Sequence, residues 1–108
     1  MADEVKITDG NFDEVVAKSK GLVLVDFYAD WCLPCRMLTP TMEQLAKDYA
    51  GRVKIGRLDV DKNPDAAVAF SVTGIPTLML FKDGKSVERV VGLQTADALK
   101  AVLDKHLE

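Results

Sequence analysis

The sequence lacks the features that mark membrane, secreted and nucleic-acid-binding proteins. Its apolar runs are far shorter than the roughly 20 residues that a bilayer-crossing helix needs. Its first residues, Met1 to Lys6, lack the basic start, apolar stretch and small-residue cleavage site of a secretory signal. Its 14 Lys and Arg are scattered among 17 Asp and Glu, for a net charge of −3. We therefore expect no membrane segment and a cytoplasmic location. We also expect no nucleic-acid partner, because phosphate binding needs clustered cations.

Histidine and cysteine, the residues that most often bind zinc, are also scarce. The 108 residues include one histidine, His106, and two cysteines. A zinc site normally needs four ligands, so a metal would have to lie between two chains that each contribute two cysteines. His106 stands near the end of the last predicted helix, and we expect it to be solvated. No metal site is therefore expected within a single chain.

Strand and helix patterns alternate along the chain and predict an α/β fold. The apolar content of 48% is enough to fill one core, so we expect a single domain over residues 1–108. Predicted strands cover residues 5–7, 22–28, 52–60, 77–81 and 86–91. Predicted helices begin near residue 12, at 34, at 64 and near 95. This order implies a central mixed sheet of about five strands, with parallel crossovers, one hairpin and about four helices on both faces.

Local signals refine several of these elements. Residues 22–28 are apolar almost throughout, which is typical of a central strand covered on both faces. Asn63 and Thr95 are expected to cap the helices that follow them. Met37 and Met42, both in the helix predicted for residues 34–49, are expected to fill the core.

The two cysteines stand three residues apart in Trp31-Cys32-Leu33-Pro34-Cys35, where the predicted central strand gives way to a helix. In a first helical turn, residues at this spacing lie close enough for a reversible disulfide. The first sulfur lies at the helix N-terminus, where free N–H groups and the helix dipole favour a thiolate. We therefore predict that Cys32 is the nucleophile and that Cys35, one turn inside the helix, resolves the mixed disulfide.

Other roles for the pair stay open at this point. As a structural crosslink it closes a four-residue loop, worth about 1.9 kcal/mol against roughly 3 kcal/mol for a 15-residue loop. Two chains could pool their cysteines in a bridging metal site, which would give a cysteine-dependent dimer. The thiols could be inert, or the domain could be a binding module for which turnover is incidental. Cysteine pairs at a strand-to-helix junction in an α/β pattern nevertheless favour redox chemistry.

The segment Phe27-Tyr28-Ala29-Asp30-Trp31-Cys32-Leu33-Pro34-Cys35-Arg36 resembles the active-site segment of the thioredoxin family. The similarity extends over the whole chain, and its further matches are Asp26, Pro40, Asp59-Val60-Asp61, Gly74-Ile75-Pro76-Thr77, Gly84 and Gly92. It implies a thioredoxin-like fold and a protein dithiol–disulfide oxidoreductase, a protein-disulfide reductase that works through a mixed disulfide. It also implies a cis bond between Ile75 and Pro76, beside the cysteines.

The resemblance further implies how the pair is recharged and what docks near it. Electrons are expected from an NADPH-dependent flavoprotein, thioredoxin reductase, and no cofactor is bound because the sulfur pair carries the electrons. A monomer in cytoplasmic electron transport and cell redox homeostasis is implied. Residues expected to support the site or bind substrate are Trp31, Leu33, Pro34, Arg57, Ile75, Pro76 and Gly92. Around Cys32 we also expect an apolar collar of Trp31, Leu33, Ile75, Pro76 and Gly92, which Val91 and Leu93 extend unless they belong to the core.

Asp26 stands inside the apolar run 22–28, where a carboxylate is costly to bury unless it is paired or neutral. In the family this aspartate acts in proton transfer with the buried cysteine, so the resemblance implies that Asp26 assists deprotonation of Cys35, directly or through a water. A structural alternative is an ion pair with Arg57, which shares a strand face with Ile55 by period-two counting. Both roles are compatible.

The chain departs from the family pattern at three positions. Leu33 replaces the usual glycine between the first cysteine and the proline, which favours helix by close to 1 kcal/mol and adds apolar bulk beside the sulfur. Tyr28 stands where many members have a second tryptophan. Arg57 stands where lysine is common and places a permanent positive charge near Asp26. These changes bear on redox potential and on the fit to the reductase.

Overall fold

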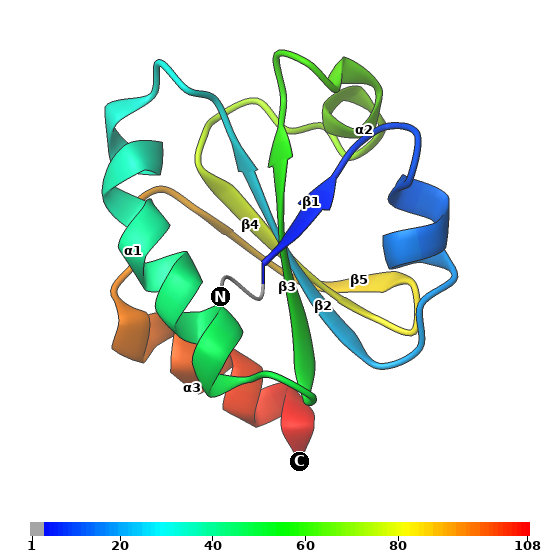
Figure 1. Ribbon diagram of the computed structural model, residues 1–108, viewed down its shortest axis with the longest axis vertical. Coiled ribbons are helices and arrows are strands. Elements are labelled where there is room, and N and C mark those ends of the chain that lie inside the picture. Colours follow the sequence, from blue (N-terminus) through cyan, green and yellow to red (C-terminus); the bar gives the residue numbers. More distant parts are fainter. Residues whose placement is uncertain (1–3) are drawn as a thin grey trace.

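The elements alternate as predicted along residues 4–108, the part of the chain that the computed structural model describes (Figure 1). In chain order they are β1 (Val5–Ile7), η1 (Asp13–Ala17), β2 (Leu22–Tyr28), α1 (Leu33–Asp48), β3 (Val53–Asp59), α2 (Pro64–Ala69), β4 (Thr77–Lys82), β5 (Lys85–Val91) and α3 (Ala96–Leu107). None of these helices is long and apolar enough to cross a membrane. The strand and helix order confirms the α/β prediction.

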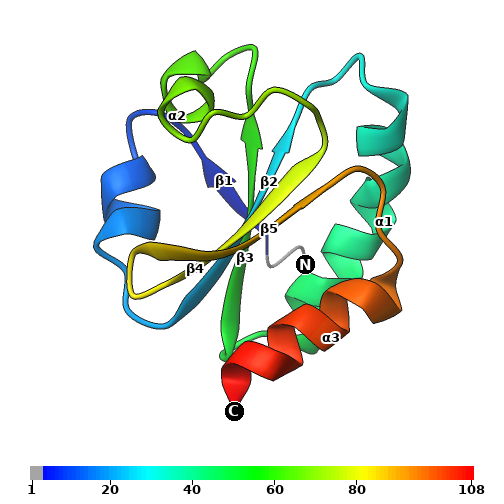
Figure 2. The ribbon, with the colours of Figure 1, turned by 180° about the vertical axis from the view of Figure 1, so that it is seen from behind.

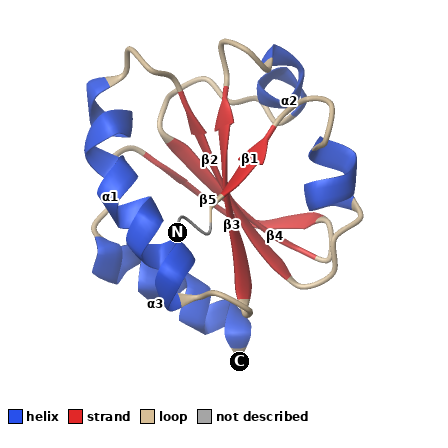
Figure 3. Cartoon of the chain, viewed as in Figure 1, coloured by secondary structure: helices blue, strands red, loops and turns tan. Residues whose placement is uncertain are grey.

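The strands form one mixed sheet in the order β1-β3-β2-β4-β5 (Figure 3). β1 and β2 run parallel to β3, whereas β4 runs antiparallel to both β2 and β5. Helices α1 and α3 cover one face, and η1 and α2 cover the other (Figures 1 and 2). The predicted central strand is confirmed, because β2 has a partner strand along each of its edges.

Alternating residues of β2 serve two separate core layers. Leu22 and Leu24 pack with Leu38, Met42 and Leu45 of α1 in one cluster. The intervening residues of β2, Val23, Val25 and Phe27, belong to the cluster on the opposite face. Because side chains alternate along a strand, Asp26 lies on the α1 face of the sheet.

The helix predicted from residue 12 is a single π-helical turn, η1, in which Lys18 N–H donates to the Asp13 carbonyl at 2.8 Å. Its apolar positions, Phe12, Val15 and Val16, span one turn only, and the polar residues after Ala17 offer no further core contact. The helix therefore ends after one turn, where its apolar positions end. The predicted hairpin is confirmed: Asp83 and Gly84 both have positive φ, as a type I′ turn requires.

The cap of α2 differs from the expectation. Asn63 is the N-cap residue but makes no side-chain cap bond. Its amide instead donates to the Asp59 carbonyl at 3.1 Å and accepts from Asp9 N–H at 3.0 Å. The carboxylate of Asp9 accepts the free N–H groups of Asp65 at 3.1 Å and Ala66 at 3.0 Å, so α2 is capped from a loop far away in sequence. Thr95 caps α3 as predicted, since its Oγ1 accepts Ala98 N–H at 3.1 Å.

Replacing Asp9 with alanine is expected to lower the free energy of unfolding by about 1 to 2 kcal/mol, because two N–H groups at the start of α2 lose their acceptor. Urea unfolding followed by circular dichroism measures this. Asp13→Ala removes an exposed carboxylate on the same side of the sheet and should change stability by less than about 0.5 kcal/mol. Equal effects of the two substitutions would contradict the capping role of Asp9.

Two expectations about single side chains are wrong. Met37 is exposed, because Leu38 and Met42 form the buried stripe of α1 and Met37 lies off that stripe. His106 is half-buried rather than solvated. It follows Leu99 and Leu103 at helical spacing on the inner face of α3, and its Nε2 lies 3.6 Å from Glu88 Oε1.

Candidate active site

The cysteine pair lies at the point where β2 leads into α1. Cys32 is the N-cap residue of α1, with φ −84° and ψ 112°, and its Sγ accepts the N–H of Cys35 at 3.2 Å. A disulfide joins the two cysteines, whose Cα atoms are 5.2 Å apart. Cys32 is 4% exposed and Cys35 0%, in the predicted order. The first sulfur thus occupies the place of a helix-capping oxygen.

The loop before β4 lies against the first cysteine. Cys32 Sγ is 3.8 Å from the carbonyl oxygen of Ile75. The bond from Ile75 to Pro76 is cis, as the resemblance implies. Pro76 is buried, so it offers less contact area than expected, and its carbonyl accepts Gly92 N–H at 2.8 Å. This bond ties the loop to the end of β5, beside Val91.

Apolar side chains around the pair are exposed. Trp31 is 70% exposed, Leu33 64%, Val91 58% and Leu93 46%. Core packing for Val91 and Leu93 is therefore excluded. Pro34, between the cysteines, is exposed as well.

The Trp31 ring is fixed although it is exposed. Its Nε1 donates to Asp61 Oδ2 at 2.8 Å. Beside it lies a cavity of about 310 Å³, whose wall includes Trp31, Val60 and Ile75. Val60 and Ile75 also pack against the buried cluster that contains Cys32. The apolar cavity therefore opens next to the sulfur pair.

Asp26 is 0% exposed and pairs with Arg57 across β2 and β3. Arg57 Nε donates to Asp26 Oδ2 at 3.1 Å, so the predicted ion pair is confirmed. The other oxygen, Oδ1, is buried and has no hydrogen-bond partner among the described residues. Burial raises the pKa of Asp26 from its ordinary 3.8 to about 6, against the opposing effect of the Arg57 charge. Arg57 thus binds Oδ2 of the carboxylate, and Oδ1 remains available to accept a hydrogen bond or a proton.

The position of Asp26 relative to the cysteines follows from the topology. Leu22 and Leu24, on the same face of β2, belong to the core cluster that includes Leu38, Met42 and Leu45 of α1. The helix turns back over β2 after Cys32, so residues further along β2 lie beneath its earlier turns (Figure 1). Asp26 therefore lies on the sheet face that α1 covers, in the half of β2 that leads to the cysteines.

Arg57 has two further neighbours. Its guanidinium carbon lies 4.2 Å from the centre of the Tyr28 ring, a cation–π geometry. Its Nε also lies 3.9 Å from Glu4 Oε2. Glu4 was not predicted from the sequence as part of the site. No local sequence signal places it there, because its approach to Arg57 depends on the pairing of Lys6 with Arg57 between β1 and β3.

A model of the family described as Thioredoxin matches residues 3–105. The chain belongs to the thioredoxin family. Thioredoxin of Staphylococcus haemolyticus (strain JCSC1435) is 54% identical over 103 residues, covering 95% of this chain and 97% of that protein. Thioredoxin of Staphylococcus aureus (strain Mu50 / ATCC 700699) is 52% identical over the same share of each chain.

The fold comparison agrees with the family. The structure of a mutant thioredoxin from Halobacterium salinarum NRC-1 matches with a TM-score of 0.88 and 44% identity, covering 99% of this chain and 94% of that one. The thioredoxin-like fold predicted from the sequence is therefore confirmed. As a thioredoxin-family member with a Cys32–Cys35 pair, the chain is a protein dithiol–disulfide oxidoreductase.

The electrons of a thioredoxin-family protein reside in its sulfur pair, and the family needs no bound cofactor. Between residues 4 and 108, no three His, Cys, Asp or Glu side chains are grouped so that they could hold a metal ion. His106 lies in α3, paired with Glu88 rather than with a cysteine. The conclusion that the cysteines act as a redox pair rests on the family and on their geometry.

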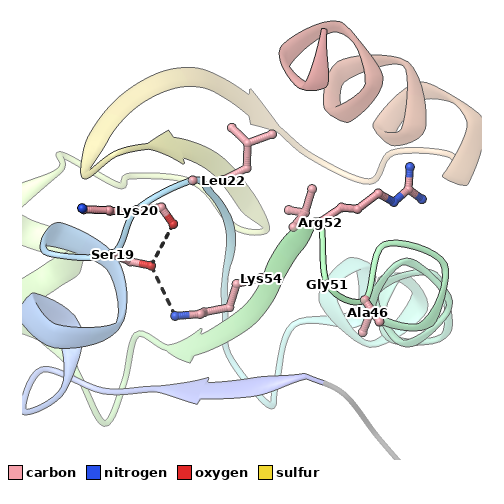
Figure 4. Close-up of a pocket in the computed structure, with 10 residues that line it drawn as sticks. Ser19, Lys20, Leu22, Ala46, Gly51, Arg52 and Lys54 are labelled. Carbon is pink, nitrogen blue, oxygen red and sulfur yellow. Dashed lines mark hydrogen bonds between the residues drawn. The ribbon is translucent and has the colours of Figure 1, made fainter.

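A larger cavity of about 570 Å³ lies at the other end of β2, away from the cysteines of this thioredoxin-family chain (Figure 4). Its cations do not converge on one point, because the Lys20 amino group and the Arg52 guanidinium point in opposite directions. Lys54 Nζ donates to Ser19 Oγ at 3.3 Å, and Arg52 Nη2 donates to the Asp48 carbonyl at 2.7 Å. None of the site residues predicted from the sequence lines this cavity.

Proposed function

We propose that Cys32 attacks disulfides of protein substrates and that Cys35 completes the exchange. In the reduced chain, the Cys32 thiolate attacks one sulfur of the substrate disulfide, and the other substrate sulfur leaves as a thiolate. Cys35, once deprotonated, attacks Cys32 Sγ, which forms the Cys32–Cys35 disulfide and releases the second substrate thiolate. The substrate gains two electrons and the chain loses two.

The observation that carries this assignment is the cap position of Cys32. Its Sγ accepts a backbone N–H from the first turn of α1 at 3.2 Å. A negative charge at this position is stabilised by the N–H groups and by the helix dipole. Cys35 lies one turn inside the helix and is fully buried, which leaves it no access to a substrate before the mixed disulfide forms.

Asp26 is assigned the removal of the Cys35 proton, directly or through a water. Its buried Oδ1 has no hydrogen-bond partner within residues 4–108, and Asp26 lies on the sheet face that α1 covers. Its pKa of about 6 lets it be ionised at neutral pH and still take up a proton. Arg57 supports the role because it holds the other carboxylate oxygen at 3.1 Å.

The apolar collar is assigned to substrate docking. Trp31 and Leu33 are largely exposed next to Cys32, and Ile75 packs against the cluster that contains Cys32. Gly92 and the buried Pro76 hold the loop that carries Ile75. Apolar contact of this kind suits extended, disulfide-bearing segments of many sequences.

The wider setting of the reaction follows the thioredoxin family. The chain works as a single domain over residues 1–108 and as a monomer. An NADPH-dependent flavoprotein, thioredoxin reductase, returns the pair to the dithiol, and protein disulfides are the acceptors. We place the chain in the cytoplasm, in electron transport and cell redox homeostasis, with no nucleic-acid or membrane partner.

Alkylation of the reduced chain tests the nucleophile assignment. Near pH 7, iodoacetamide is expected to modify Cys32 at least about fivefold faster than a cysteine in an unstructured peptide, since the thiolate fraction is larger. Mass spectrometry locates the adduct, and Trp31 emission follows the loss of the disulfide on reduction. The Cys32→Ser variant, which retains Cys35, should react slowly. Two equally slow thiols would overturn the assignment.

A further inference from the structure

We propose that Glu4 competes with Asp26 for the single guanidinium of Arg57 and thereby sets how firmly that cation holds the Asp26 carboxylate. Arg57 Nε lies 3.1 Å from Asp26 Oδ2 and 3.9 Å from Glu4 Oε2. The inference rests on the proposed proton transfer by Asp26 for its functional meaning. Glu4 is a positioning residue in this scheme, because it acts through Arg57 and touches neither sulfur nor substrate.

The sheet register places the three charged groups on one face. Arg57 of β3 pairs with Asp26 of β2 on one side and with Lys6 of β1 on the other. Glu4 lies two residues before Lys6 and so shares its face, whereas Ile7 belongs to the opposite core cluster. Glu4 and Asp26 therefore approach Arg57 from its two opposite sides.

Burial makes this arrangement matter. The Glu4 side chain is 15% exposed, and its Oε2 is buried without a hydrogen-bond partner in the described part of the chain. Asp26 Oδ1 is likewise buried without a hydrogen-bond partner among the described residues. Two largely buried carboxylates thus depend on one cation, and with both ionised the cluster carries a net negative charge. Interactions between charges are strongest where water is excluded.

The charged and titratable groups around the pair come from four elements. They are Lys6 on β1, Tyr28 on β2, Arg57 on β3 and Glu43 on α1. Burial raises the pKa of Glu4, with Arg57 opposing the rise and Glu43 adding to it. The Glu4 charge in turn adds to the rise in the pKa of Asp26. The Glu4 charge therefore favours the protonated form of Asp26.

The test compares Glu4→Gln with the native chain in its oxidised form, in which no thiol titrates. Carboxyl carbon shifts of Asp26, measured by NMR from pH 4 to 8, report its ionisation directly. With the Glu4 charge removed, Arg57 serves Asp26 alone, so the ratio of ionised to protonated Asp26 at a fixed pH is expected to rise about threefold. The titration midpoint then lies at lower pH.

Glu14→Gln is the matched control, since Glu14 is exposed on η1, across the sheet from Arg57. It makes the same change in net charge and should leave the Asp26 midpoint in place. An unchanged midpoint in Glu4→Gln overturns the inference, even if the variant loses stability, because Glu4 would then only tether the chain before β1.

Rates of protein-disulfide reduction across the same pH range separate the inference from the proposed function. A rate profile that moves with the Asp26 midpoint supports both. A midpoint that moves under an unchanged rate profile supports the coupling through Arg57 and contradicts proton transfer by Asp26.

Discussion

A chain with Cys35 replaced by serine is expected to stay covalently joined to its first protein substrate. Cys32 keeps its cap position and attacks, but no second sulfur remains to release the product. Multiple-turnover reduction should fall by roughly a thousandfold or more. A non-reducing gel should show an adduct of chain and substrate that dithiothreitol dissolves.

Cys32→Ser is the matched variant for this experiment. It also loses turnover, but it should form no adduct, because Cys35 is 0% exposed and cannot reach a protein disulfide. A stable adduct in Cys32→Ser and none in Cys35→Ser would reverse the two roles. Turnover in both variants at the native rate would favour a function in which the cysteines take no part.

Asp26→Asn is expected to stabilise the fold at neutral pH and to slow the reaction. Folding raises the pKa of Asp26 from 3.8 to about 6. When Asp26 is ionised, the free energy of unfolding is therefore lower by about 3 kcal/mol than when it is protonated. Asparagine keeps the shape without the charge. Reduction of a protein disulfide should slow at least about tenfold, because Cys35 loses the group that takes its proton.

The stability gain has a defined pH dependence. Below pH 3.8 Asp26 is protonated in both the folded and the unfolded chain, so native and variant differ little there. Between pH 3.8 and about 6 the native chain loses stability relative to the variant, and above about 6 the difference is complete. Urea unfolding at pH 3.5, 5 and 7.5 follows this course.

Asp30→Asn provides the control for Asp26→Asn, since Asp30 is an exposed carboxylate only a few residues away. Its stability should change by less than about 0.5 kcal/mol at each pH. A stability difference for Asp26→Asn that is the same at pH 3.5 and 7.5 would show that ionisation is not its cause. A native reaction rate in Asp26→Asn would remove the catalytic assignment.

Patterns that repeat within one element predicted the frame of the molecule. The nearly continuous apolar run 22–28 identified the central strand, because a strand covered on both faces is apolar on both sides. The cysteine spacing at a strand-to-helix junction placed Cys32 at the cap, and period-two counting paired Asp26 with Arg57. Each of these inferences needs only the geometry of a single helix or strand, or the pairing of two neighbouring strands.

Contacts between distant segments were beyond the reach of such patterns. Asp9 caps α2 from 56 residues away, and nothing near Asn63 reveals that its side chain is engaged elsewhere. Glu4 joins the site only because β1 pairs with β3, which depends on the order of strands in the sheet. Met37 was wrongly predicted to lie in the core, because an exposed apolar residue next to the buried stripe of a helix cannot be distinguished in the sequence from a buried one.

The enclosure of β2 between β3 and β4 has a consequence for repeated use of the protein. Partner strands flank β2 on both edges from Leu22 to Phe27, so we expect its amide hydrogens to exchange with solvent only in rare, large openings of the sheet. The strand that aims Asp26 and leads to Cys32 is thus among the last parts of the molecule to loosen. The redox pair at the start of α1 is therefore attached to a strand that opens only together with a large part of the sheet.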